Sequence, residues 1–120
     1  MKKTAPKILD KKDTASASSM LYLSFCRALD KYCEQIGVSS RRFSAVRILH
    51  DAACNTVSKM HVVTIAQQRH MARMERNIPQ MFEGLIEISA TDGCLRTVER
   101  MSAMSLAQVS SIIAQNSRKR

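Results

Sequence analysis

The chain has very little glycine, proline or aromatic side chain: three Gly, two Pro, three Phe, two Tyr and no Trp among 120 residues. Because the tight turns of β-sheets depend on glycine and proline, so small a supply leaves little turn chemistry for a β architecture. The apolar content comes mostly from Ala, Val, Ile and Leu, with eight Met. A chain of this length forms one domain at most. The sequence therefore predicts a single all-α domain.

Several sequence motifs that mark other classes of protein are missing. No apolar run reaches the length of a membrane span, so we expect no membrane partner. The start, "MKKTAPKILDKK", is basic but lacks the apolar segment of a secretory signal, so the cysteines should be thiols in a reducing compartment. No glycine-rich phosphate loop, G-x-S-x-G or H-E-x-x-H motif occurs. We therefore expect neither catalysis nor a cofactor.

The four cysteines, Cys26, Cys33, Cys54 and Cys94, form no C-x-x-C pair. His50 and Cys54 are four residues apart, which lets them hold a metal together on one helix face. Two ligands do not make a structural zinc site, and the others would come from distant parts of the chain. We expect buried structural thiols and no metal centre.

The spacing of apolar residues predicts four helices. The first covers roughly 20–35 and ends before Gly37. The second covers about 42–71, close to eight turns, with an apolar arc over 45–63 that is wide enough to be covered from more than one side. A short helix should follow from about Asn77, then a break at 89–93 and a final helix over about 94–114. Most methionines fall at helical spacing, which favours a role in a core or a dimer interface.

The net charge of +9 is concentrated at both ends and in local clusters. Residues 1–19 hold five Lys against two Asp, and the chain ends in "RKR". We expect a disordered basic tail over 1–19, a folded domain over 20–114 and a basic end over 115–120. Such a balance of charge suits nucleic acid or an anionic membrane surface.

The order of elements resembles the histone fold: a medium helix, a short loop with paired serines, a long helix, a basic loop and a short helix. The further C-terminal helix makes the chain most similar to core histone 2B, over roughly residues 20–110. "LSFCRALDKYCEQIGVSS" resembles the first helix and loop of that family. "GVSSRRF" matches its Gly-Ile-Ser-Ser-Lys-Ala-Met stretch, "ERNIPQMFEGLI" follows its third helix, and "GCLRTVERMSAMSLA" tracks its final helix.

The resemblance implies two kinds of site. Two histone chains clasp head to tail and cover each other's long helix, which assigns the dimer interface to Val46, Leu49, Ala53, Val57, Met60 and Val63. The clasp pairs the first loop of one chain with the second loop of its partner to hold DNA phosphates. The implied DNA-binding residues are Ser39, Ser40, Arg41 and Arg42 in the first loop and Arg69, His70 and Arg73 in the second.

The function implied by the resemblance is to pair with a histone 2A-type partner and package double-stranded DNA in nucleosome-like particles, with a histone 3/histone 4-type tetramer as a further partner. The implied location is the nucleus and its chromatin, or the virion of a virus. The sequence departs from the family in the second loop, where Lys-Arg-Ser-Thr is replaced by residues 69–72, "RHMA". Two glutamates of the family's acidic patch correspond to Cys94 and Ser102. Such divergence is typical of a viral or specialised histone.

Two alternatives stay open. A histone-fold subunit of a transcription or kinetochore complex would form the same dimer but bind DNA weakly. A helical-bundle chaperone or adaptor would take a partner helix on a Met-rich face, and would fold as a monomer or homodimer without a histone partner.

Overall fold

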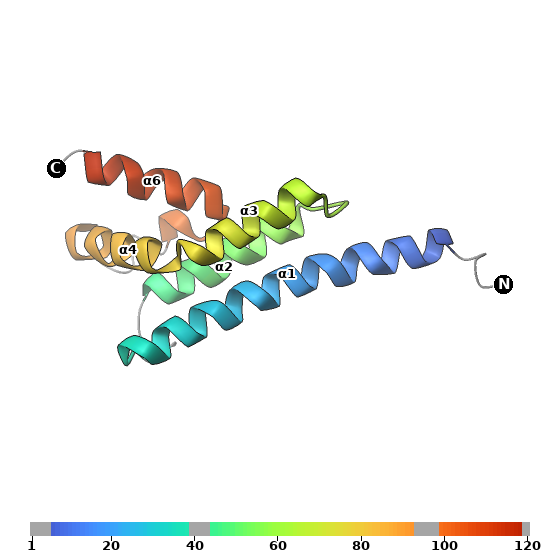
Figure 1. Cartoon of the computed structure of the whole chain (residues 1–120). Coiled ribbons are helices and arrows are strands. Elements are labelled where there is room, and N and C mark those ends of the chain that lie inside the picture. The colour runs from blue at the N-terminus through green and yellow to red at the C-terminus, as the bar shows by residue number, and fades with distance from the viewer. Residues whose placement is uncertain (1–5, 39–43, 93–98, 119–120) are drawn as a thin grey trace.

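The computed structural model describes residues 6–38, 44–92 and 99–118, and they form helices and the turns between them (Figure 1). No β-strand occurs in these ranges, so the prediction of an all-α protein is confirmed. The named helices are α1 (Pro6–Ile36), α2 (Ser44–Ser58), α3 (Ile65–Arg76), α4 (Ile78–Asp92) and α6 (Leu106–Arg118).

The helices form an elongated bundle. Figure 1 shows α2 running back along α1, α3 returning in the direction of α1, and α4 continuing from α3 after a bend. α6 packs on both α4 and α2, while α1 contacts α2, α3 and α4. Each of the four C-terminal elements therefore has at least two neighbours within the same chain.

The first helix is much longer than the sequence pattern predicts. It starts at Pro6 and includes residues 6–19, which the sequence pattern assigns to a disordered tail, while residues 1–5 lie outside the described part. Residues 7–19 contain no glycine or proline and several Lys and Ala, which favour helix, and proline is tolerated in a first turn. At the other end the prediction is confirmed. Gly37 has φ 79° and Val38 N–H donates to the Cys33 carbonyl at 2.8 Å.

The predicted long helix over 42–71 is wrong, because the structure divides it at residues 59–64. The N-terminus of α3 is stabilised by a capping box: Gln67 N–H donates to Thr64 Oγ1 at 3.1 Å, and Thr64 N–H donates to Gln67 Oε1 at 2.9 Å. Val62 and Val63 precede the cap, and β-branched residues have restricted side-chain freedom in a helix. The capping box therefore starts a new helix at this point, and α2 does not continue into α3.

The predictions for the C-terminal half are partly correct. α4 begins at Ile78, next to the start at about Asn77 that the pattern predicts for the short helix, and Pro79 stands in its first turn. α3 continues to Arg76, past the end at about residue 71 that the pattern predicts. α4 extends through 89–92, which the pattern assigns to a break. The final helix over 94–114 is interrupted as well: the helix at 99–101 ends before Ser102, and α6 begins at Leu106.

Polar contacts from α2 fix the start of α6. Leu106 N–H donates to Thr56 Oγ1 at 2.9 Å. The Asn55 side-chain amide donates to the carbonyls of Ser102 at 2.9 Å and Met104 at 3.0 Å. These bonds satisfy backbone groups that a helix end leaves unpaired, and they tie the turn before α6 to the body of the bundle.

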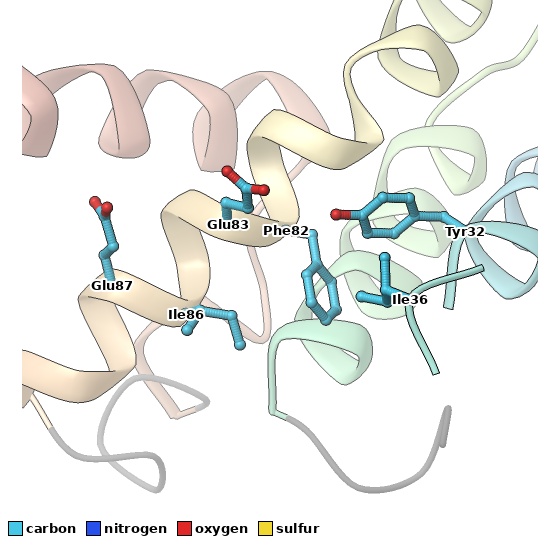
Figure 2. Close-up of a pocket in the computed structure, with 6 residues that line it drawn as sticks. All are labelled: Tyr32, Ile36, Phe82, Glu83, Ile86 and Glu87. Carbon is cyan, nitrogen blue, oxygen red and sulfur yellow. The ribbon is translucent and has the colours of Figure 1, made fainter. Parts of the chain in front are cut away.

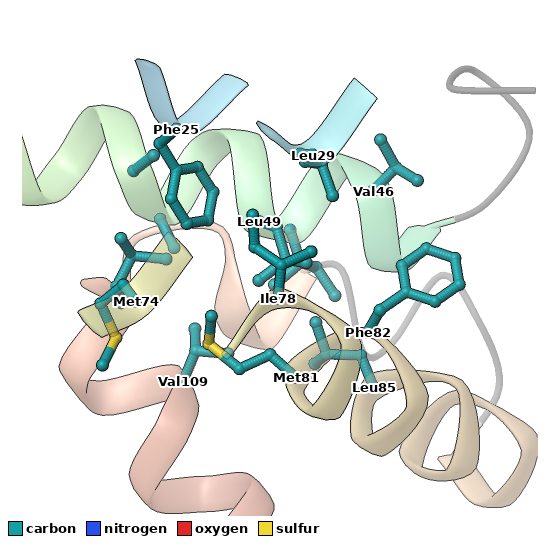
Figure 3. Packing of buried hydrophobic residues seen from close by; sticks show 14 of the residues in the cluster. Phe25, Leu29, Val46, Leu49, Met74, Ile78, Met81, Phe82, Leu85 and Val109 are labelled. Atoms are coloured by element: carbon teal, nitrogen blue, oxygen red, sulfur yellow. The ribbon is translucent and has the colours of Figure 1, made fainter. Parts of the chain in front are cut away.

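Every named helix contributes to one hydrophobic core (Figure 3). The buried side chains at its centre are large and aliphatic or aromatic, and Tyr32 packs edge-on against Phe82 with ring centroids 5.5 Å apart. Five of the methionines are buried in this core, which confirms a core role for them: Met60, Met71, Met74, Met81 and Met101.

The residues that the resemblance assigns to a dimer interface lie inside this core, and their role in a dimer stays a prediction. Leu49 and Ala53 are 0% exposed and Val46 is 1% exposed. Met60 is buried, and Val57 and Val63 pack against the same cluster. Within the described residues α1, α4 and α6 pack on α2, so the chain itself covers the wide apolar arc.

The crossing of α4 and α6 depends on Gly84. A Cβ added at Gly84 would collide with Ile113 Cγ2. We expect Gly84→Ala to lower the free energy of unfolding by about 1–3 kcal/mol through overpacking, despite the better helix propensity of alanine. Urea denaturation measures this, and the Ile113→Ala background, which removes the colliding methyl, should abolish the loss. A neutral Gly84→Ala variant would contradict the close crossing.

Candidate nucleic-acid interface

The most basic feature of the described surface is one face of α3. Arg69, Arg73 and Arg76 are exposed and follow one another at spacings of four and three residues. Residues at these spacings lie on the same side of a helix. We call these three residues the arginine face. It extends about 10 Å along the axis, since each residue adds about 1.5 Å.

The opposite side of α3 anchors the helix. Met71 is 0% exposed and Met74 is 5% exposed, and both belong to the core. Glu75 accepts a hydrogen bond from Ser24 Oγ of α1 at 2.7 Å. Packing and this bond fix the rotation of α3 about its own axis. The arginine face is therefore held toward solvent by a rigid element.

The charge around the arginine face is strongly one-sided. Between residues 52 and 82 the chain has four Lys or Arg and one acidic residue, Glu75. The additional cation, Lys59, is exposed in the turn that precedes α3. The single carboxylate of this stretch is hydrogen-bonded to Ser24 of α1, so positive charge prevails on α3 and on the turn before it.

His70 is on α3 but differs from its arginine neighbours. It is only partly exposed, and burial, followed by the nearby Arg73 guanidinium, lowers its pKa below the ordinary value of 6.5. At neutral pH the imidazole is therefore uncharged and adds no cation to the arginine face.

This pKa shift predicts an acid-sensitive contribution to stability. The folded-state pKa of His70 lies below the unfolded value, so the unfolded chain binds more protons in acid. The contribution is complete above about pH 6.5 and is lost as pH falls through the folded pKa. We expect His70→Asn to lose less stability than the parent between pH 7.5 and pH 5, measured by urea denaturation. Equal losses in both proteins would contradict this.

The implied DNA-binding residues have different outcomes. Arg69, His70 and Arg73 lie on the body of α3, not in a loop past the end of a long helix, because the chain turns before α3. Ser39, Ser40, Arg41 and Arg42 lie outside the described residues. Among the described residues, Arg69 and Arg73 of the implied second loop share one face of α3 with Arg76.

A second surface feature is a shallow groove between α1 and α4 (Figure 2). Its volume is about 470 Å³. The apolar walls are Tyr32 and Ile36 from α1 and Phe82 and Ile86 from α4, and Glu83 and Glu87 stand along α4. We call this feature the acidic-edged groove.

The exposure of this groove was partly predictable. Glu83 and Glu87 are four residues apart, which places them on one side of a helix, and both are exposed. Burial, followed by the Glu83 carboxylate, raises the pKa of Tyr32, so its hydroxyl stays protonated. The pairing of α1 with α4 that forms the groove has no signal in the sequence.

The cysteines are in three different environments. Cys33 is buried, as expected of a structural thiol, whereas Cys54 is exposed and Cys26 is intermediate. Cys94 lies outside the described residues. The described part of the chain contains no group of three or more side chains arranged to hold a metal ion.

None of the helices in the described ranges combines the length and apolar character that crossing a membrane requires. Searches of protein-family models, curated proteins and solved structures find no significant match to this chain.

Proposed function

We propose that this protein binds double-stranded DNA through the arginine face and coats or packages it without catalysis. The observation that carries the proposal is the exposure of three arginines on one face of a helix whose other face is anchored in the core. Guanidinium groups form paired hydrogen bonds with phosphate oxygens and keep their charge at any physiological pH.

The proposed contacts are to the phosphate backbone. Phosphate contacts position a protein on the duplex and carry no direct sequence information. The described surface around Arg69, Arg73 and Arg76 gives no reason to expect readout of base edges. Binding should therefore be weakly selective for sequence and strongly dependent on salt.

The experiment is a titration of fluorescently labelled duplexes of unrelated sequence at 50–200 mM salt, read by anisotropy. With three phosphate contacts, the logarithm of the affinity should fall against the logarithm of salt with a slope of about −3. Similar affinities for the different duplexes would support backbone recognition. Absent binding, or binding that does not respond to salt, would contradict the proposal.

The resemblance to histone 2B supports a more specific form of this function, in which the chain pairs with a histone 2A-type partner in nucleosome-like particles. That pairing would require α2 and α3 to join through residues 59–64 into one helix and to exchange their internal contacts for the partner's. Co-refolding with such a partner, followed by light scattering at high salt, tests it. A 1:1 heterodimer would support the histone form of the proposal. A chain that stays monomeric in the presence of the partner would contradict the histone form, but not DNA binding through the arginine face.

A second candidate is an adaptor that acts through protein contacts without DNA, and the acidic-edged groove favours it. In a chain of net charge +9, an apolar groove beside Glu83 and Glu87 is complementary to a peptide that carries both apolar and basic side chains. A helical peptide of Leu and Lys is a suitable probe, with a Leu and Glu peptide as its control. Specific binding of the first, lost in Glu83→Lys, would support the adaptor. Equal affinity for both peptides would exclude this groove as a binding site for a basic peptide.

A further inference from the structure

Four side chains with related chemistry meet between α1 and α2. Tyr22, Cys26 and Asp30 are at successive spacings of four residues, so they share one face of α1. His50 faces them from α2. Cys26 Sγ lies 3.3 Å from His50 Nδ1, and His50 Nε2 lies 3.9 Å from Asp30 Oδ1.

The sequence of contacts from Cys26 to His50 to Asp30 is the one by which a protein activates a thiol. A nucleophile within hydrogen-bonding distance of an imidazole, whose other nitrogen faces a carboxylate, is the arrangement by which enzymes activate Ser and Cys. The 3.9 Å separation allows an electrostatic contact between His50 and Asp30 that favours the tautomer with a proton on Nε2. That tautomer leaves Nδ1 free to accept the thiol proton.

Tyr22 supplies a second contact to the sulfur. Its hydroxyl is hydrogen-bonded to Cys26, and this bond is the main reason why the pKa of Tyr22 is raised to about 12. The phenol therefore remains protonated and donates to the sulfur, which favours the thiolate. Burial outweighs this effect and raises the pKa of Cys26, so the resting group is a thiol hydrogen-bonded to His50. Attack by this sulfur consequently needs a base.

The cluster is open to small molecules but not fully exposed. The side chains of His50 and Asp30 are 31% and 55% exposed, while Cys26 is intermediate. A peroxide can approach from the solvent side of the helix pair.

We propose that Cys26 is a peroxide-reactive thiol, with His50 as its general base and Asp30 as the residue that positions His50. The sulfur attacks one peroxide oxygen while the thiol proton passes to His50 Nδ1. An S–O bond forms, the O–O bond breaks, and the departing hydroxide takes the proton from the imidazolium to give water. Cys26 is oxidised to sulfenic acid and hydrogen peroxide is reduced to water. This activity is independent of DNA binding.

The experiment uses the full chain, hydrogen peroxide and a dimedone-type trap for sulfenic acid. Cleavage after Lys and Arg places the four cysteines on four separate peptides, so mass spectrometry follows each one. Cys26 should be trapped faster than the more exposed Cys54. His50→Gln should slow the trapping of Cys26 by at least about tenfold, a conservative figure because a positioned base usually contributes about a hundredfold or more. The trapping rate of Cys54 should stay unchanged.

Cys33 reports whether each variant remains folded, because this thiol is 2% exposed and should stay unlabelled. If His50→Gln exposes Cys33, Asp30→Asn replaces it as the test, since Asp30 is at the surface. Asp30→Asn should slow Cys26 severalfold and Asp30→Glu should retain the rate, which distinguishes positioning from a loss of structure. Faster trapping of Cys54 than of Cys26, or an unchanged Cys26 rate in a folded variant, would overturn the proposal.

Discussion

Replacing Arg69, Arg73 and Arg76 together by alanine is expected to weaken DNA binding by about a hundredfold or more at 50 mM salt. The salt slope should become shallower by about three, one for each lost phosphate contact. The reason is geometric: the three arginines share one exposed face of α3, so in the proposed complex they neutralise neighbouring phosphates together. Anisotropy titrations of both proteins at several salt concentrations measure affinity and slope in one series.

The matched control removes the same charge from other helices. Arg27 and Lys31 on α1 and Arg47 on α2 are also exposed, so their alanine variant has the same net charge as the arginine-face variant. It should change affinity only modestly through the general field of the protein. If the two triple variants lose equal affinity, binding follows net charge and the arginine face is not the site.

Leu49→Ala is expected to lower the free energy of unfolding of the isolated chain by about 2–5 kcal/mol, which is a large part of the stability of a domain of this size. Leu49 is 0% exposed and lies in the core that α1, α2 and α4 share (Figure 3). Truncation leaves a cavity that the surrounding helices fill only in part. Urea denaturation of the chain without any partner is the measurement.

Leu23→Ala is the control for this variant. Leu23 is 47% exposed, and substitutions at such positions usually change stability by about 0.5 kcal/mol or less. A histone-type clasp gives a different result: the chain alone would unfold without cooperativity, and Leu49→Ala would act mainly on the dimer. The comparison therefore separates a self-contained bundle from a chain that depends on its partner.

The sequence predicted the features of the fold that depend on local chemistry. Gly37 ends α1 in a left-handed conformation, α4 begins next to Asn77, and the scarcity of turn residues disfavours a β fold. The turn at 59–64 was missed because Val57, Met60 and Val63 continue the helical spacing. Apolar residues at those positions are buried equally well by a continuous helix or by a turn, so periodicity cannot distinguish them. The Thr64-x-x-Gln67 capping box was the available signal.

The candidate sites were predictable to different degrees. The cluster Arg69, Arg73 and Arg76 is visible as local charge, although its position on a helix face depends on where α3 begins. The contact between Cys26 and His50 joins residues 24 apart on two helices. Only the pairing of α1 with α2 determines it, and the four-residue spacing of Tyr22, Cys26 and Asp30 gives no indication of the partner on α2.

The central claim is that a self-contained bundle binds DNA through the exposed side of α3. Its most direct test is a titration of the isotopically labelled chain with a short duplex, followed through the amide resonances by NMR. The account predicts dispersed resonances without a partner, and shifts concentrated at residues 65–76 that reverse on addition of salt, with little change beside Glu83 and Glu87. Shifts centred on another helix, or a chain that becomes ordered only with a histone 2A-type partner, would contradict it.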